Sequence, residues 1–358
     1  MSALLDAGVC FARLVPPTDI RSRFSQSGDS VLFSGGECSS GIPAAERPRV
    51  RAINLVDGTI STIAGDSFSP VVSPSGRLAY ARGSGPITPA DGPRWTTEVM
   101  VVIGGVTESW TDPGQSEGRY QPLAWAGDTL ITRFEFAASG YAELRVLRGP
   151  DDETRLEDSF LHAVSPGGSH FLVNEDPLRD FIVLYEATTL QRVATISYHD
   201  WLAVAAPGKD LPEAFRDSRV PFDPPTGGSL TTSFTGEWLD DDRIVLNADG
   251  LAVIRVHSNR TAMELERRVP IGAAPSGIGA TIVVALTPAG PNEIAVRAQR
   301  ITYPSAPVIP VNPTPEQVQS AARGSVPSSA TEDYLCNIEI GSCEPSLEDY
   351  FDRIPGHD

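Results

Sequence analysis

Two histidines, His162 and His199, are the residues in this sequence best able to do acid–base chemistry. His199 is followed directly by Asp200, and a histidine beside a carboxylate can transfer protons near neutral pH. His162 lies in the apolar segment LHAV, just before a Ser-Pro-Gly-Gly turn. No third partner can be identified for either histidine. A hydrogen-bonded structural histidine is therefore the favoured interpretation, with acid–base chemistry as the alternative.

Motifs that could indicate a hydrolase or a calcium site are better explained as turns and links. GQSEG, residues 114–118, matches the G-x-S-x-G nucleophile elbow, which needs its serine on a turn between a strand and a helix. The residues after Ser116 predict no helix, so Ser116 is not assigned as a nucleophile. The run Asp240–Asp242 lacks the alternating ligand spacing of an EF-hand loop and is typical of a solvated turn. We therefore assign no catalytic residue, which favours a non-enzymatic protein without excluding an enzyme.

The composition indicates a globular chain of many short strands. Of its 358 residues 41% are hydrophobic, enough for a core, and 32 glycines with 31 prolines argue against long helices. The net charge of −18, with Lys209 as the only lysine, disfavours binding to nucleic acid. No apolar run is long enough for a transmembrane helix, and residues 1–17 do not resemble a signal peptide. As written, the chain is expected in the cytoplasm; an upstream signal would place it in the cell envelope or outside the cell.

A phrase made of an apolar run, a turn with Gly or Asp, and a second apolar run recurs along the chain. Each copy predicts a β-hairpin, and each is followed by a second hairpin. Successive copies are mostly separated by the roughly 40–50 residues of a four-stranded propeller blade. The sequence therefore predicts an all-β fold, a six-bladed β-propeller of four-stranded antiparallel blades. The copies are FSQSGDSVLF (24–33), VVSPSGRLAY (71–80), PLAWAGDTLIT (122–132), AVSPGGSHFLV (163–173), FTGEWLDDDRIVL (234–246) and VVALTPAGPNEIAV (283–296).

Two of these copies resemble a known blade signature. SPSGRL (Ser73–Leu78) and SPGGSHF (Ser165–Phe171) are similar to the signature of TolB-like six-bladed propellers and to phrases in WD-repeat-like bacterial propellers. The resemblance covers about residues 19–348; it implies the fold and little about function. Nothing in the chain corresponds to the separate N-terminal domain of TolB, so the partners of that protein are not expected here.

We expect one domain over residues 1–358, with elaborations between and within blades. The predicted blades are approximately residues 19–66, 67–112, 119–158, 159–198, 231–270 and 278–348, with inserted loops at 199–230 and 302–332 and a tail at 349–358.

The lengths of the predicted connections place the long loops on one face. In a four-stranded blade the first-to-second and third-to-fourth turns lie on one rim, and the second-to-third loops and the blade-to-blade links lie on the other. The short turns all fall in the first group, so we expect a loop-rich face around one channel mouth, where binding is common. The candidate ligand-binding residues at that mouth are Arg23, Tyr120, His162 and His199.

The four cysteines lack the spacing of a zinc site, and no histidine pair lies near them in the sequence, so we expect no metal and no cofactor. Cys336 and Cys343 flank the predicted turn of the last hairpin, and Cys10 and Cys38 could both reach the loop-rich rim of the first blade. We predict disulfides Cys10–Cys38 and Cys336–Cys343, with four free thiols in a reducing cytosol as the alternative.

The leading interpretation is a non-enzymatic, monomeric platform that binds a protein, peptide or glycan through the loop-rich face, with no nucleic-acid partner and no membrane insertion. One alternative is a hydrolase or lactonase at the channel mouth, since similar six-bladed propellers host such enzymes. Another is the sensor domain of a cell-envelope protein. An enzyme should bring carboxylates and a histidine together at the mouth, whereas a platform should present a broad loop surface with exposed aromatic residues.

Overall fold

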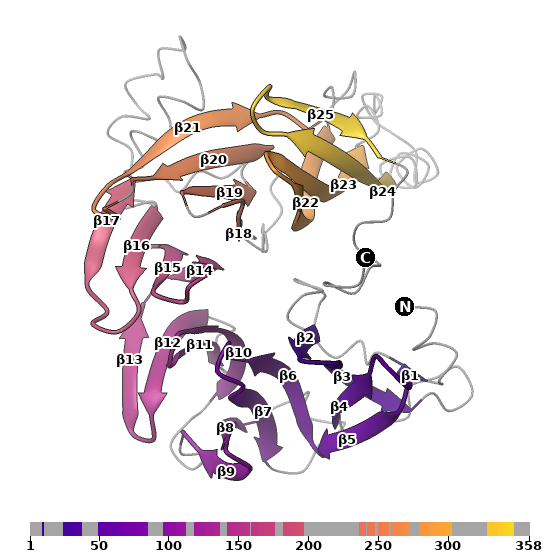
Figure 1. The fold of residues 1–358 in the computed structure, drawn as a ribbon, viewed down its shortest axis with the longest axis vertical. Coiled ribbons are helices and arrows are strands. Elements are labelled where there is room, and N and C mark those ends of the chain that lie inside the picture. Colours follow the sequence, from indigo (N-terminus) through magenta and orange to yellow (C-terminus); the bar gives the residue numbers. More distant parts are fainter. Residues whose placement is uncertain are drawn as a thin grey trace, which may run out of the picture. The chain divides into compact units, whose positions relative to one another are not determined.

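The computed structural model describes residues 9–10, 24–37, 49–84, 96–111, 118–136, 142–157, 159–175, 182–196, 236–240, 242–247, 250–257, 259–271, 279–302 and 328–346 (Figure 1). These residues form strands and turns, with no helix among them and hence no helix that could cross a membrane. The strands fall into two compact units, which we describe separately: unit 1 holds β1–β17 and unit 2 holds β18–β25.

Unit 1 contains four antiparallel sheets, in each of which four strands pair in chain order. A short strand, β1 (Val9–Cys10), pairs with β3 and adds a fifth strand to the first sheet. Blade 1 is β2 (Phe24–Ser27), β3 (Ser30–Glu37), β4 (Arg49–Asn54) and β5 (Ile60–Ala64); blade 2 is β6 (Ser67–Val72), β7 (Leu78–Ser84), β8 (Thr96–Ile103) and β9 (Val106–Ser109); blade 3 is β10 (Gly118–Ala126), β11 (Thr129–Phe136), β12 (Ala142–Gly149) and β13 (Asp152–Leu156); blade 4 is β14 (Phe160–Val164), β15 (His170–Asn174), β16 (Ile182–Glu186) and β17 (Arg192–Ile196).

Unit 2 contains two further sheets with the same strand order. Six antiparallel sheets that each follow the chain through four strands are the blades of a six-bladed β-propeller, so the predicted all-β propeller fold is confirmed. The single domain and its exact bounds stay predictions. Blade 5 is β18 (Gly236–Trp238), β19 (Arg243–Asn247), β20 (Leu251–Val256) and β21 (Met263–Val269); blade 6 is β22 (Gly279–Gly290), β23 (Glu293–Thr302), β24 (Ser328–Asn337) and β25 (Ser342–Pro345).

The last blade differs from the sequence expectation in one strand. β24 begins at Ser328, inside the segment 302–332 that the sequence indicates as a loop, and Ser328 pairs with Thr302. The residues Ser328–Thr331 are small and mostly polar, so they lack the apolar pattern by which a strand is recognised. These residues therefore pair with β23 because they continue the register of the rest of β24, and not because of their own strand propensity.

The first-to-second turns of blades 2 and 4 are built from the same Ser-Pro-x-Gly phrase. Ser73 Oγ accepts a hydrogen bond from the Arg77 amide (2.9 Å), and Ser165 Oγ accepts one from the His170 amide (3.0 Å). The glycine that ends each phrase has a left-handed φ, 82° at Gly76 and 67° at Gly168. That region is costly for residues with a Cβ, which explains why this phrase closes hairpins.

An extra residue interrupts the pairing of the first two strands in blades 3 and 4. Leu123 lies between Pro122, which pairs with Thr132, and Ala124, which pairs with Ile131. His162 has the same place in blade 4, between Leu161 and Ala163. Such bulges bend and twist a strand locally. They also interrupt the alternation of buried and less buried side chains, which in β10 runs from Gly118 to Leu123 and stops at the bulge.

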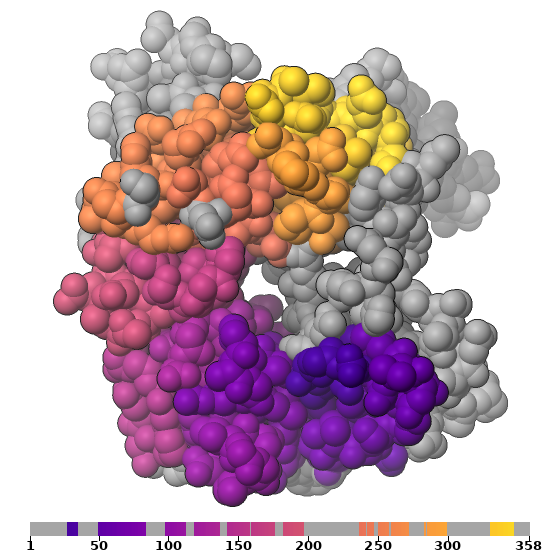
Figure 2. Space-filling view, in the orientation of Figure 1, coloured from indigo at the N-terminus to yellow at the C-terminus, as the bar shows by residue number. Residues whose placement is uncertain are grey.

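The core of unit 1 lies between neighbouring blades. Figure 2 shows the side chains of blades 1–4 packed together where the ribbon view leaves gaps between sheets. Because both faces of an inner strand are covered, strands such as β12 are continuously buried over most of their length. The cluster between blades 2 and 3 comprises Val71, Ala79, Val99, Val101, Trp110, Tyr120, Trp125, Leu130, Phe134 and Leu147.

Candidate binding site

Tyr120, one of the predicted ligand-binding residues, lies on β10 in the core between blades 2 and 3. Its side chain is buried, and its backbone exchanges hydrogen bonds with the Thr97 hydroxyl at 2.6 and 3.1 Å. Its phenol donates to Glu153 (2.6 Å) and accepts from Arg145 (2.7 Å). Burial raises the pKa of the Tyr120 phenol, so it stays protonated near neutral pH. In this arrangement Tyr120 joins two blades, and its role in ligand binding stays a prediction.

Arg145 is the centre of the polar network that holds the Tyr120 hydroxyl. Its Nε donates to Glu143 (2.8 Å), and its Nη1 lies 3.1 Å from a Glu153 carboxylate oxygen. The guanidinium also lies over the Phe134 ring, 3.4 Å from the ring centre. Arg145 and Glu143 are both buried, so each needs the other's charge. The network therefore holds all four strands of blade 3 together.

His162 is buried at the bulge of β14, with 7% of its surface exposed. Burial lowers the pKa of its imidazole to about 3, because the charged form loses its hydration. The ring is therefore uncharged at neutral pH. Neither its placement nor its pKa tests the predicted role in ligand binding, which stays a prediction.

The remaining predicted site residues lie outside the described residues, or their side chains do. Arg23, His199 and Cys38 are not described, and β1 contributes only the backbone of Cys10. The expected grouping of Arg23, Tyr120, His162 and His199 around one mouth is thus untested. At the other end of the chain Cys336 and Cys343 pair across β24 and β25 and are joined by a disulfide, the same pair that the sequence suggested.

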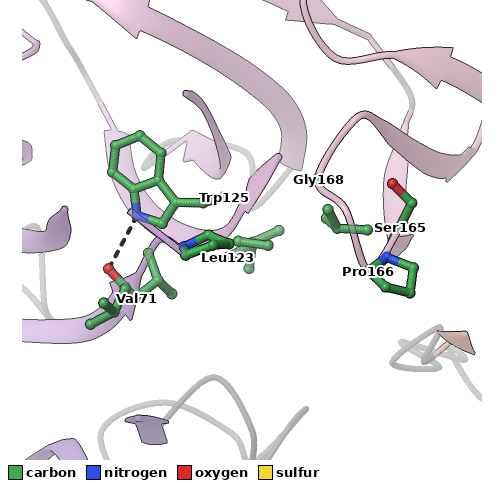
Figure 3. A pocket seen from close by; sticks show the side chains of 10 residues that line it. Val71, Leu123, Trp125, Ser165, Pro166 and Gly168 are labelled. Carbon is green, nitrogen blue, oxygen red and sulfur yellow. Dashed lines mark hydrogen bonds between the residues drawn. The ribbon is translucent and has the colours of Figure 1, made fainter. Parts of the chain in front are cut away.

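A cavity of about 310 Å³ lies where the first strands of blades 2, 3 and 4 end in their turns (Figure 3). In Figure 3 Val71 and Trp125 form one side, Leu123 lies in the middle, and Ser165, Pro166 and Gly168 form the opposite side. Its lining is Val71, Val72, Pro74, Leu123, Ala124, Trp125, Val164, Ser165, Pro166 and Gly168. No ionisable side chain is among these, so the cavity is suited to an apolar group.

The walls of this cavity are held in place by contacts between blades. The Trp125 indole Nε1 donates to the Val71 carbonyl (3.2 Å), and its ring packs edge-on against Trp110. The turns of blades 3 and 4 touch so closely that a Cβ added to Gly168 would lie 2.5 Å from the Gly127 amide nitrogen. Because strands and tight turns supply the walls, the cavity exists without a ligand.

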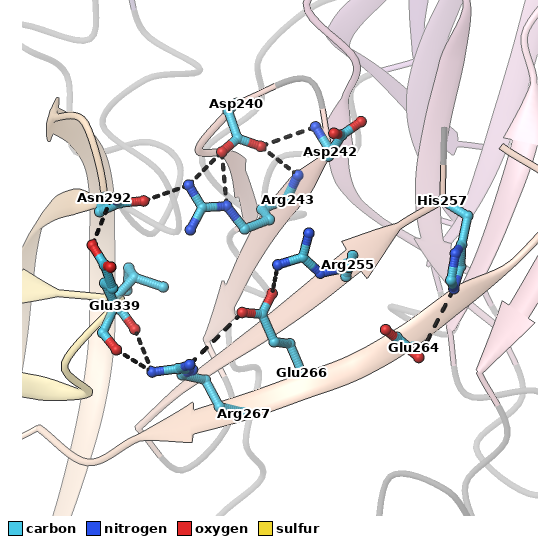
Figure 4. A network of polar contacts seen from close by, with 11 residues as sticks. Asp240, Asp242, Arg243, Arg255, His257, Glu264, Glu266, Arg267, Asn292 and Glu339 are labelled. Atoms are coloured by element: carbon cyan, nitrogen blue, oxygen red, sulfur yellow. Dashed lines mark hydrogen bonds and ion pairs between the residues drawn. The ribbon is translucent and has the colours of Figure 1, made fainter. Parts of the chain in front are cut away.

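In unit 2 a charged network joins the turns of blades 5 and 6 (Figure 4). Of the run for which a turn was predicted, the structure describes Asp240 and Asp242; Asp240 accepts hydrogen bonds from the amides of Asp242 (2.9 Å) and Arg243 (2.7 Å). Arg243 also donates to Asn292, whose side-chain amide donates to Glu339 (3.1 Å). Within the described part of the chain, no group of three or more His, Cys, Asp or Glu could hold a metal ion.

Sequence reasoning singled out the residues of the cavity for their turns but missed the cavity itself. Ser165, Pro166 and Gly168 belong to the SPGG turn, and Pro74 belongs to the SPSG turn. The sequence feature that could have indicated the cavity is the Ser-Pro-x-Gly turn, which recurs at the end of the first strand in blades 2 and 4. Repeated blades bring equivalent positions together, so equal phrases indicate a shared surface.

Comparison with known protein families finds no match, and comparison with curated proteins finds no relative. Among solved structures, the uncomplexed acylaminoacyl peptidase of Pyrococcus horikoshii is 10% identical with a TM-score of 0.44, and the match covers 91% of this chain and 45% of that chain. The Cps50 (Swd1) β-propeller domain of Myceliophteria thermophila is 10% identical with a TM-score of 0.44, covering 91% of this chain and 96% of that one. A PL25 ulvan lyase is 10% identical with a TM-score of 0.42, over 95% and 84%.

These likenesses are weak, and the chain spans less than half the length of the peptidase. The class of protein is defined instead by the six four-stranded sheets, which make this chain a β-propeller.

Proposed function

We propose that this chain is a non-enzymatic β-propeller platform that binds a protein, peptide or glycan through its loop-rich ends. The observation that carries the proposal is that the longest connections all leave from one end of the sheets, although blade 5 has only residues 248–250 there, between β19 and β20. Short turns, such as residues 104–105 between β8 and β9, close the first-to-second and third-to-fourth pairs. The connections at the other end include residues 38–48, 85–95, 197–235 and 303–327.

Contacts between turns support this division within each unit. The close approach of Gly127 and Gly168 joins the short turns of blades 3 and 4, and the Arg243–Asn292 hydrogen bond joins those of blades 5 and 6. Since antiparallel strands alternate in direction, the long connections of these blades then leave from the opposite end. Long connections on a rigid set of strands can form a binding surface without altering the core.

The test compares the whole chain with a variant in which residues 304–326 are replaced by a short Gly-Ser linker joining β23 to β24. Both proteins are applied to a glycan array and to an array of synthetic peptides. We expect binding by the whole chain that is lost in the linker variant. A matched control inserts the same linker between Gly104 and Gly105, at the short-turn end of blade 2, and should bind like the whole chain.

Two results would contradict the proposal. One is binding that survives the replacement of residues 304–326 and of residues 86–94 alike. The other is saturable hydrolysis of ester or lactone substrates by the purified chain, which would favour the hydrolase alternative.

A further inference from the structure

We infer that the cavity at the short-turn end of blades 2–4 is a second binding site, which takes one large apolar side chain from a basic peptide. This site lies at the opposite end of the strands from the loop-rich ends, so the inference does not depend on the proposed function. It is carried by the cavity's lining, its size and the charges on the turns around it.

The lining selects an apolar group. Val71, Leu123 and Trp125 supply aliphatic and aromatic surface from two blades, and Val164 and Pro166 supply it from a third. The Trp125 indole nitrogen already donates to the Val71 carbonyl, and the Ser165 hydroxyl already accepts from the His170 amide. The polar atoms of these two side chains are thus engaged within the protein, so an entering group gains chiefly from apolar contact.

The size selects a single side chain. A volume of about 310 Å³ lies at the lower end of the range of small-ligand sites, so it can take a phenylalanine, leucine or methionine side chain but not a folded segment. The walls come from strands and from turns with left-handed glycines, which leaves little freedom for the cavity to expand. We therefore expect one anchor residue, with the flanking peptide lying over the turns.

The charges on the short turns of unit 1 select a basic peptide. The described turns and strand ends there carry more carboxylates than guanidinium groups. Asp128, on the turn between β10 and β11, has a side chain that is 74% exposed and pairs with Arg77 at 3.0 Å, while Arg148 pairs with Asp152 at 2.9 Å. The carboxylates are those of Asp29, Asp57, Asp128, Asp151, Asp152 and Glu186. With a net charge of −18 over the whole chain, this surface attracts a cationic partner.

The experiment measures fluorescence anisotropy of labelled pentapeptides with the whole chain. The probes are Arg-Arg-Xaa-Arg-Arg with phenylalanine, leucine or alanine at the centre, and Glu-Glu-Phe-Glu-Glu. We expect the phenylalanine and leucine probes to bind about tenfold or more tightly than the alanine probe, because the alanine leaves the cavity empty. The glutamate-flanked probe should not bind, and salt should weaken the arginine-flanked probes.

Two variants assign the binding to this cavity. Ala124→Phe fills it from its own wall and should weaken the phenylalanine probe at least about tenfold. Val56→Phe is the matched control, since it adds the same ring at a side chain that is already exposed on a turn of blade 1. Asp128→Lys should weaken every arginine-flanked probe several-fold, and its exposed position keeps the fold intact if Ala124→Phe fails to fold.

Several outcomes would overturn the inference. These are no binding of any probe, equal affinity for the phenylalanine and alanine probes, or an unchanged affinity in both Ala124→Phe and Asp128→Lys. Sedimentation of the unmodified chain is measured in parallel. A dimer that Ala124→Phe dissociates would mean that a second copy of the chain, and not a basic peptide, occupies the cavity.

Discussion

Arg145 is the single residue on which the buried polar network of blade 3 depends. The substitution Arg145→Met is expected to lower the free energy of unfolding by about 3–5 kcal/mol, because Glu143 would be left buried without its cation. The Tyr120 hydroxyl would lose a hydrogen-bond donor at the same time. Urea unfolding followed by tryptophan fluorescence measures this loss.

Arg155→Met is the matched control for that measurement. Arg155 lies opposite Arg145 on the neighbouring strand β13, and its side chain is 60% exposed. It too lies near Glu153, at 3.3 Å, but solvent screens the pair, so we expect a loss below about 1 kcal/mol. Equal losses in the two variants would show that burial is not what makes Arg145 important.

His162 makes stability depend on pH. The folded protein keeps this imidazole uncharged down to a pKa of about 3, whereas in the unfolded chain it titrates near 6.5. Below pH 6.5 the unfolded state therefore binds the extra proton, and stability falls as the pH is lowered towards 3. Lowering the pH from about 7.5 to about 5.5 should therefore lower the free energy of unfolding by about 1.4 kcal/mol through His162 alone.

The variant His162→Gln tests this dependence through the slope of unfolding free energy against pH. This substitution should remove the contribution of His162 to the slope, even if it also changes the stability at neutral pH. A slope that persists in His162→Gln would mean that other groups are responsible for it.

Among the structural elements, the first-to-second turns of blades 3 and 4 lie close together at Gly127 and Gly168. Gly168→Ala should destabilise the protein more than Gly76→Ala does. Both substitutions put a Cβ on a left-handed residue, at a cost of about 1–2 kcal/mol. Only the Cβ at position 168 would also collide with a backbone atom, that of Gly127, while the one at position 76 meets nothing within 4 Å.

The difference between these two variants isolates the contact between the turns of blades 3 and 4. Thermal unfolding followed by circular dichroism gives both stabilities from the same transition. If Gly76→Ala destabilises the protein as much as Gly168→Ala does, the close approach of the turns of blades 3 and 4 adds nothing to the cost of a left-handed alanine.

Over the whole molecule, charged side chains are used in two ways. Some arginines hold strands or turns together through a carboxylate, as Arg297 does with Asp333 across β23 and β24 (2.8 Å). The acidic excess gives the net charge of −18, a sign that disfavours nucleic acids and is consistent with the basic peptide proposed above. The same chain thus combines ion pairs within blades with an acidic surface.

Much of the fold could be predicted because the repeated phrase acts locally. Turn residues such as Gly76 and Gly168 close hairpins through their own backbone preferences, and apolar runs on either side make the strands. The start of β24 at Ser328 could not be predicted, because its small, mostly polar residues carry no such signal and pair with the neighbouring strand β23.

The surroundings of the candidate site residues could not be predicted, since they depend on distant neighbours, and the roles of these residues stay predictions. The sequence predicts Tyr120 at a channel mouth but says nothing of the side chains around it. Its surroundings are set by Arg145 on β12 and Glu153 on β13, neither of which is close to it in sequence. The pKa of His162 likewise depends on burial that no local pattern reveals.

The sequence by itself determined the all-β class, the number of blades and the turn phrases, because each of these depends on residues within a few positions of one another. Only the tertiary structure decided which side chains meet. The cavity of blades 2–4 needs the ends of three separate strands at one place, and its walls come from Val71, Leu123 and Pro166. Side-chain contact across blades is set by packing between segments far apart in the chain, which local sequence does not encode.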